Sequence, residues 1–429
     1  MARQFVPILA LFMSTAFLLA GGGVQWILLP IRSQIEGFST NQIGLIGAGW
    51  AIGFTAGCII VPRMVRRAGH IRSFGSLSAM LAIAILLSAM VVQPSVWFLL
   101  RIVAGLCFSG SYMIIESWIN VRVTNETRGA IFSVYLVITQ LAMIAGQYVI
   151  VFAAPETDRP FMIAAILFAL AILPMALSKS PSPEPLEQVK LNLRELYVNS
   201  PAALVGVFLA GAIAGAWQNF SPVFGNMSGM SNTAIATMLS LAILGSALFQ
   251  YPFGRLSDKI DRRYVMVGIG IGGAVIGLTT GFWRFDPASP GIVFFSLMLL
   301  TGAFIYPVYA VLVAHANDHA APEDYVHVSS SLLMVYGTGT MVGPLVTARA
   351  TDWFGAGGLF ITIAAMNLAI ALHSGWRLVR RPAPPEEEAM EFQTLAPATA
   401  QTPQSYVLAP SAEAAEEMAE TAAEDIQAG

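Results

Sequence analysis

The chain has 429 residues, of which 56% are hydrophobic and only 11% are charged. A soluble globular domain carries about 25% charged residues, so this composition excludes a soluble protein and predicts one that crosses a membrane many times. The formal net charge is −3, but residues 385–429 hold ten acidic and no basic side chains. The first 384 residues therefore carry a balance of +7.

Twelve apolar runs are long enough to cross a hydrocarbon layer that needs about 20 residues. They predict an all-α membrane protein with helices near residues 5–31, 41–62, 73–92, 96–118, 129–153, 160–178, 201–223, 232–254, 264–284, 290–314, 327–349 and 357–376. Both cysteines, Cys58 and Cys107, lie inside these runs, so no disulfide framework is expected.

The basic residues are distributed unevenly between the two sides of these spans. With the N-terminus inside, 17 of the 22 lie on cytoplasmic segments, and only Arg32, Arg159, Arg284 and Arg349 lie on outer loops. This bias predicts that both termini are cytoplasmic, and it requires an even number of spans.

Composition also predicts the domain boundaries. A charged stretch that begins SPSPEP separates two groups of six spans, so we expect bundles at 1–178 and 201–378 with a cytoplasmic linker at 179–200. Residues 379–429 are rich in proline, alanine and glutamate, which predicts a disordered acidic cytoplasmic tail.

The two groups of spans have matching residues in the same order, which indicates a duplication. One set is offset by 192 residues: Gly37 with Gly229, Ile43 with Ile235, and Gly53 with Gly245. After the longer loop around residues 284–287 the offset is 197: Gly105 with Gly302, Tyr112 with Tyr309, and Gly146 with Gly343. Parallel repeats of six helices, related by an axis along the membrane normal, are a transporter architecture.

The fourth span carries the only two formal charges deep within an apolar run, Arg101 and Glu116. Together with Gly105, Ser109 and Tyr112 they form a helical stripe roughly 80° wide. A charge at the bilayer centre costs at least about 2.5–3.5 kcal/mol, so this face must look into protein or water. The two charges lie about 22 Å apart along the helix and cannot pair with each other.

The loop from Gly254 to Arg263 has a glycine, an aspartate four residues later and then a basic cluster. It resembles the cytoplasmic signature of the major facilitator superfamily, although Asp261 stands where that signature has a second glycine. The resemblance implies a gating loop made by Gly254, Arg255, Asp258, Arg262 and Arg263. The corresponding loop of the first half has Pro62 and Arg66 at the glycine and aspartate positions, which puts a matching gate there in doubt. The alternative is an ordinary basic loop.

The sequence from Arg101 to Gly105 resembles the fourth-helix pattern of this superfamily, which implies a role for Arg101 in proton coupling. The alternative is an arginine that extends to the outer interface. Glu116 is the best candidate for a proton-binding carboxylate, because partial burial raises the pKa of a carboxyl group toward neutrality. The alternative for Glu116 is a structural pair with Arg122 or Arg128.

Aromatic and amide residues recur in the helices that would surround a central cavity. They suit a mainly uncharged substrate, although half of them could be packing residues instead. The candidates are Gln25, Trp26, Tyr112, Trp217, Gln218, Asn219, Tyr306 and Tyr309. A group of histidines and acids near His315 lacks the metalloprotease order, so no metal site and no cofactor are expected.

The resemblance covers roughly residues 5–378 and implies two pseudo-symmetric six-helix bundles around a central site. The function it implies is a secondary active transporter of the bacterial inner membrane, which moves a small organic solute by alternating access with proton coupling. No P-loop is present, so an ion gradient is the expected energy source. The expected partners are the solute, protons and the lipid bilayer, with no nucleic acid and a monomeric chain. The alternatives are a membrane-embedded enzyme and a receptor that no longer transports.

Overall fold

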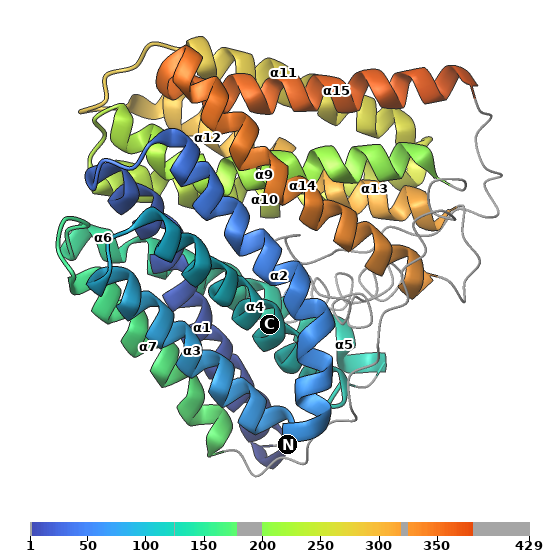
Figure 1. The fold of residues 1–429 in the computed structure, drawn as a ribbon. Coiled ribbons are helices and arrows are strands. Elements are labelled where there is room, and N and C mark those ends of the chain that lie inside the picture. The colour runs from blue at the N-terminus through green and yellow to red at the C-terminus, as the bar shows by residue number, and fades with distance from the viewer. Residues whose placement is uncertain (1, 124, 178–199, 319–324, 381–429) are drawn as a thin grey trace, which may run out of the picture.

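The computed structural model describes residues 2–123, 125–177, 200–318 and 325–380 (Figure 1). Helices make up nearly all of this part, and it contains no strand. The first group of helices is α1 (Ala2–Ile35), α2 (Thr40–Ala68), α3 (His70–Met90), α4 (Pro94–Asn120), α5 (Asn125–Gln147), α6 (Val149–Phe152) and α7 (Arg159–Ala176). The second is α9 (Pro201–Met227), α10 (Asn232–Lys259), α11 (Arg262–Phe282), α12 (Gly291–Ile305), α13 (Pro307–Asn317), α14 (Tyr325–Phe354), the 3₁₀ turn η2 (Gly355–Gly357) and α15 (Gly358–Arg380).

The predicted twelve spans and the all-α membrane fold are confirmed. Helix α6 extends α5 after a break at Tyr148, and α13 extends α12 after a break at Tyr306. Eleven segments of the described chain are long and apolar enough to cross a membrane. The longest, Ser331–Arg380, contains most of α14 and all of α15 and therefore accounts for two spans.

Several observed helices are longer than the predicted spans. Helix α2 continues six residues past the predicted end at Pro62, and α14 continues to Phe354. Hydropathy detects only the apolar part of a helix, whereas backbone hydrogen bonding continues beyond that part. The predicted linker at 179–200 lies outside the described residues apart from Ser200, and so does the predicted tail apart from the last two residues of α15.

Each half is held together by glycines that bring two helix backbones into contact. A Cβ atom built on Gly53 of α2 would lie 1.8 Å from the carbonyl oxygen of Ile102 in α4. In the second half, a Cβ atom on Gly245 of α10 would lie 1.9 Å from the carbonyl oxygen of Leu299 in α12. These two contacts are related by the offsets of 192 and 197 residues that the sequence predicts for the repeat.

The same correspondence holds for a second helix pair in each half. A Cβ atom on Gly146 of α5 would lie 2.0 Å from the carbonyl oxygen of Ala20 in α1, and one on Gly343 of α14 would lie 2.0 Å from that of Ala212 in α9. Small residues are the usual means of close helix packing in lipid, where no hydrophobic driving force exists between helices. The two halves are therefore repeats in packing as well as in sequence.

The turns that start the second helix of each half also match. Gly37 has a φ of 77° and Gly229 a φ of 80°, a left-handed conformation that glycine adopts without strain. The serine two residues later accepts a backbone hydrogen bond at each helix start: Ser39 from Gln42 and Ser231 from Ala234.

The two halves lie against each other along α2 and α14 and diverge toward the end of the molecule that carries Ala2 and Arg380 (Figure 1). Hydrogen bonds join the halves at the opposite end. The amide nitrogen of Asn226 in α9 donates to the side-chain oxygen of Gln34 in α1 over 2.7 Å. Because these two residues are 192 positions apart, the bond joins equivalent positions and lies on the pseudo-two-fold axis.

Two further hydrogen bonds flank this axial pair. The hydroxyl group of Thr40, at the start of α2, donates to the carboxylate of Asp352 near the end of α14. The amide of Asn232, at the start of α10, donates to the carbonyl oxygen of Ile150 in α6 over 3.1 Å. Thr40 and Asn232 are again 192 positions apart, so the seam at this end follows the symmetry of the repeat.

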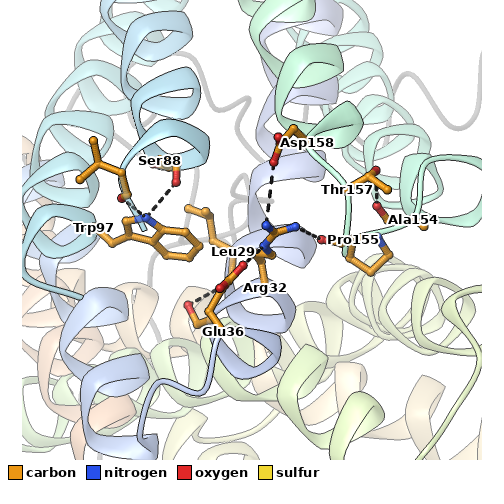
Figure 2. Close-up of polar contacts among 11 residues, drawn as sticks. Leu29, Arg32, Glu36, Ser88, Trp97, Ala154, Pro155, Thr157 and Asp158 are labelled. Carbon is orange, nitrogen blue, oxygen red and sulfur yellow. Dashed lines mark hydrogen bonds and ion pairs between the residues drawn. The ribbon is translucent and has the colours of Figure 1, made fainter. Parts of the chain in front are cut away.

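The same end of the first half is stabilised by Arg32, the last basic residue of α1 (Figure 2). Its Nε atom donates to Glu36 Oε1 over 2.7 Å, and its Nη1 atom donates to the carbonyl oxygen of Pro155 over 3.1 Å. Asp158 lies 3.9 Å from its Nη2 atom. Arg32 thereby ties α1 to the loop that precedes α7.

The glycine contacts generate a test of the fold. Gly245→Ala should destabilise the protein by about 1–3 kcal/mol, because the added methyl group meets a backbone carbonyl that cannot move independently. Gly268→Ala in α11 is the matched control, since nothing lies within 4 Å of its added Cβ atom. Thermal unfolding in detergent should show a lower transition temperature for Gly245→Ala alone, and equal transition temperatures would contradict this account of the packing.

Candidate functional site

A cavity lies between the two halves near the middle of the helices. Its volume is about 80 Å³. The first half supplies residues of α1, α4 and α5, and the second supplies residues of α9 and α10 together with Tyr306. The lining residues are Leu19, Trp26, Tyr112, Thr139, Gln140, Met143, Gln147, Trp217, Gln218, Ser221, Pro222, Leu239, Ile243, Ser246 and Tyr306.

The chemistry of the wall is amide, hydroxyl and aromatic, with no formally charged side chain. Trp26 and Trp217 present indole rings from opposite halves. The side-chain oxygen of Gln147 is buried and has no hydrogen-bond partner, so it is available to a ligand. Such a wall suits a small amphipathic solute that stacks on the aromatic rings and donates hydrogen bonds to the amides.

Five of the eight predicted cavity residues lie in this wall: Trp26, Tyr112, Trp217, Gln218 and Tyr306. The other three do not line it. Gln25 is buried elsewhere in the first half, and Asn219 donates to the carbonyl oxygen of Gly215 in its own helix. Tyr309 packs against Tyr336, with ring centroids 4.8 Å apart.

The break between α12 and α13 explains the position of Tyr309. The repeat equates it with Tyr112, which lies in the unbroken helix α4 and lines the cavity. Pro307 cannot donate a backbone hydrogen bond and begins a new helix, so the turn that faces the cavity carries Tyr306 instead.

The prediction omitted the residues that α5 contributes. One stripe of this helix lines the cavity with Thr139, Gln140, Met143 and Gln147. Its three polar residues are two neighbours, Thr139 and Gln140, and Gln147 two helical turns later. A search for polar residues at helical spacing in the fifth span would have found them.

Arg101 is buried in the first half and only 3% exposed, so it does not extend to the interface. Its guanidinium carbon lies 5.3 Å from the centroid of a Trp26 ring. Its Nε and Nη1 atoms are buried and have no hydrogen-bond partner. A buried cation without a hydrogen-bonded anion is energetically unfavourable.

Glu116 is fully buried, at 0% exposure, and accepts a hydrogen bond of 3.3 Å from the hydroxyl group of Tyr135 in α5. It is also close enough to Cys58 of α2 and Tyr112 of α4 to interact with both electrostatically. Weakly polar side chains from three helices are therefore among the neighbours of this carboxyl group.

Most of the predicted gating loop is helical, because only Ile260 and Asp261 lie between the end of α10 and the start of α11. Its polar contacts centre on Arg262. The guanidinium Nε atom donates to Asp318, at the end of α13, over 2.8 Å, and Nη1 donates to Ser257 over 3.0 Å. Asp258 lies 3.2 Å from Nη2. Gly254 is buried beneath this group, whereas Arg255 is exposed and reaches Tyr251.

Asp261, which departs from the family signature, has a role of its own as the N-cap of α11. It accepts the backbone N–H of Arg263 at 2.9 Å and pairs with that side chain at 2.6 Å. Burial by itself raises the pKa of this carboxyl group, but the bonds from Arg263 outweigh burial and bring the pKa below its ordinary value. The stabilisation is therefore complete above about pH 4 and is lost as the pH falls below that.

The described part of the chain has no group of three His, Cys, Asp or Glu side chains placed to hold a metal ion. Of the predicted cluster after α13, His315 and Asp318 are buried. His319, Glu323 and Asp324 lie outside the described residues.

The Arg262 pair provides a test of the loop. Arg262→Gln should destabilise the protein by about 3–5 kcal/mol, because it leaves the buried carboxylate of Asp318 without its charged partner. Lys259→Gln, an exposed change in the same loop, should have little effect. Thermal unfolding of the purified variants measures both, and an unchanged transition in Arg262→Gln would contradict a structural role for this pair.

Comparison with known proteins gives a consistent result along the chain. A family model described as Major Facilitator Superfamily matches residues 11–243 and 217–412. The uncharacterized MFS-type transporter YcaD of Escherichia fergusonii is 23% identical over 377 residues, which cover 85% of this chain and 94% of that protein. YcaD of Escherichia coli strain K12 is 24% identical over 383 residues, with 87% and 96% covered.

Solved structures share the fold. The nucleoside transporter NupG matches with a TM-score of 0.73 and 14% identity, covering 86% of this chain and 98% of that one. A bacterial homologue of the human lysosomal transporter Spinster, in an inward-facing and occupied conformation, matches with a TM-score of 0.67 and 14% identity, covering 88% and 96%. At such identities the likeness concerns the fold alone.

Proposed function

Because this chain belongs to the major facilitator superfamily of transporters, we propose that it moves a small organic solute across the bacterial inner membrane by proton-coupled alternating access. The observation that carries the proposal is the central cavity. Both halves supply its walls, and it contains aromatic, amide and hydroxyl groups but no formal charge. A relative movement of the halves can expose such a site to either side in turn.

The seam supports a proposal for the side to which the site is closed. Hydrogen bonds such as the axial pair Gln34–Asn226 join the halves at the end away from the termini. The distribution of basic residues supports placing the termini in the cytoplasm. The described state would then be closed to the outside, and the axial pair would have to separate before the cavity could open there.

Glu116 is the proposed proton carrier. It is buried within the membrane-spanning part of α4, on the same helix as the cavity residue Tyr112. A carboxylate in this position carries a charge through the apolar layer, whereas its protonated form does not. Protonation of Glu116 would therefore change which conformation of the first half is more stable.

Glu116→Gln should abolish accumulation of solute driven by a pH gradient while exchange of solute continues. Glutamine keeps the size and hydrogen-bonding capacity of the side chain but cannot release a proton. The measurement is uptake and counterflow in proteoliposomes, with a solute identified from its stabilisation of the purified protein. A fully active variant with an unchanged pH profile would remove Glu116 from the mechanism.

The alternative role of Glu116, as a structural partner of Arg122 or Arg128, gives a different pattern. Arg122→Gln and Arg128→Gln would then reproduce the defect of Glu116→Gln, and a double variant would be no worse than either single one. A membrane-embedded enzyme or a receptor without transport would give no flux in any variant.

The axial pair also tests alternating access. Gln34→Cys combined with Asn226→Cys, in a chain whose Cys58 and Cys107 are replaced by alanine, should be joined by a short bis-methanethiosulfonate reagent. We expect transport to fall at least tenfold and to recover after reduction, because the halves can no longer separate at this end. Each single cysteine variant, treated identically, is the control. Full transport by the cross-linked protein would contradict the proposed movement.

A further inference from the structure

Three buried hydrogen-bond donors without partners surround Trp26. Two are the Nε and Nη1 atoms of Arg101, whose guanidinium lies 5.3 Å from the indole ring. The third is the Nε1 atom of Trp50 in α2, whose ring centroid lies 4.8 Å from that of Trp26. Buried donors are nearly always paired in folded proteins, so three in one place indicate a missing acceptor.

The chain itself does not supply this acceptor. Among the described residues, Arg101 makes no ion pair, and its closest charged neighbour on α4, Glu116, is about 22 Å away along the helix axis. Arg101 is 3% exposed and Trp50 is 5% exposed, so bulk water does not satisfy them either. A buried guanidinium requires both hydrogen bonds and a compensating negative charge.

The missing group has defined chemistry. A guanidinium presents its N–H groups as a planar fork that matches the two oxygens of a carboxylate. The Trp50 indole N–H is a further buried donor without a partner, on a ring that also packs against Trp26. A neutral hydroxyl or amide could accept these bonds but would leave the positive charge uncompensated.

The group can come from the central cavity. Trp26 lines that cavity and is only partly buried, and the Arg101 guanidinium carbon lies over its ring, 5.3 Å from the ring centroid, without lining the cavity itself. A change in the side-chain torsions of Trp26 would open a path from the cavity to the guanidinium. The uncharged wall of the cavity would hold the rest of the ligand, so the ligand would carry a single charge.

We propose that Arg101 binds the carboxylate of the transported solute, which is therefore an organic monocarboxylate with an apolar or aromatic body. This assignment rests on the proposed transport function and specifies its substrate class. Trp26 separates the cavity from Arg101 and stacks on the bound acid. Trp50 donates a further hydrogen bond to it.

The charges on α4 then couple the acid to the proton. With Glu116 ionised and no solute bound, the formal charges of Arg101 and Glu116 sum to zero. With a proton on Glu116 and a carboxylate on Arg101, the sum is zero again. Either event alone leaves a net charge in the apolar interior, which disfavours movement of the half-loaded protein across the membrane. Proton and acid are therefore carried together.

The groups that face Glu116 are compatible with this cycle. Cys58 of α2, Tyr112 of α4 and Tyr135 of α5 interact with it, and none of these side chains carries a charge near neutral pH in its ordinary state. From α3, His70 stacks on Trp118, two residues from Glu116.

The test is binding of sodium acetate, hexanoate and benzoate to the full-length protein in detergent, each compared with its amide at equal concentration. We expect at least one acid to raise the transition temperature and to bind in calorimetry, and its amide to bind at least tenfold more weakly. Arg101→Gln should weaken binding of the acid at least tenfold. Arg284→Gln, an exposed outer-loop change, is the control and should bind as the unmodified chain does.

Two further variants keep the test decisive if Arg101→Gln does not fold. Trp50→Phe removes one hydrogen-bond donor. It should weaken binding of the acid several-fold and have little effect on binding of its amide. In the unmodified chain, affinity for the acid should fall as the pH rises and Glu116 ionises, and Glu116→Gln should remove this dependence. A pH dependence that is unchanged in Glu116→Gln would contradict the coupling.

The remaining outcomes separate the two proposals. Failure of all three acids to bind, equal binding of acid and amide, or equal stabilisation by sodium chloride would overturn the carboxylate assignment. Binding of the acid without flux of the radiolabelled acid in proteoliposomes would retain the site and refute transport. Flux of a neutral solute that is unaffected by Arg101→Gln would retain transport and refute the site.

Discussion

Backbone contact at glycines is the constraint on which this structure depends. Lipid provides no hydrophobic force between helices, so they associate where small residues allow close approach. Gly53 and Gly245 bring α2 against α4 and α10 against α12, and Gly146 and Gly343 do the same for α5 with α1 and α14 with α9. These contacts define two rigid groups of helices. Since each group is internally packed, the weaker seam between them is where movement can occur.

The seam is polar and symmetric at the end of the molecule away from Ala2 and Arg380. Gln34 and Asn226 occupy equivalent positions and bond to each other, and Thr40 and Asn232 make bonds on either side of them. Hydrogen bonds between neutral side chains contribute only about 0.5–1.5 kcal/mol each, so such a seam can open at moderate cost.

The polar groups inside the first half have a second role. Arg101 and Glu116 are positioned on one face of α4, and both are buried by neighbouring helices. A charge that is kept within a membrane span against its desolvation cost is usually functional. If Arg101 binds a carboxylate and Glu116 a proton, as we propose, the two charges offset each other only when both groups are free or both are occupied, and this local electrostatic condition would be linked to the movement of whole helices.

The fold was largely predictable from the sequence because its determinants are local or repeated. Apolar runs of about 20 residues specify the spans, and paired residues such as Gly37 and Gly229 recur at a constant offset because equivalent turns need the same backbone conformation. The signature loop was also recognisable, but the function of Asp261 as a helix cap was not, because capping depends on the exact start of α11.

The cavity wall was only partly predictable. Gln25 and Trp26 are adjacent in sequence, yet one is buried within its half and the other faces the cavity, because successive helical residues differ by 100° in direction. Tyr306 replaces Tyr309 since a proline divides that span. The sequence by itself determined the number of helices, their repeat and the presence of two buried charges. Tertiary structure alone decided which side chains face one another, because this depends on how each helix is rotated and where it is broken.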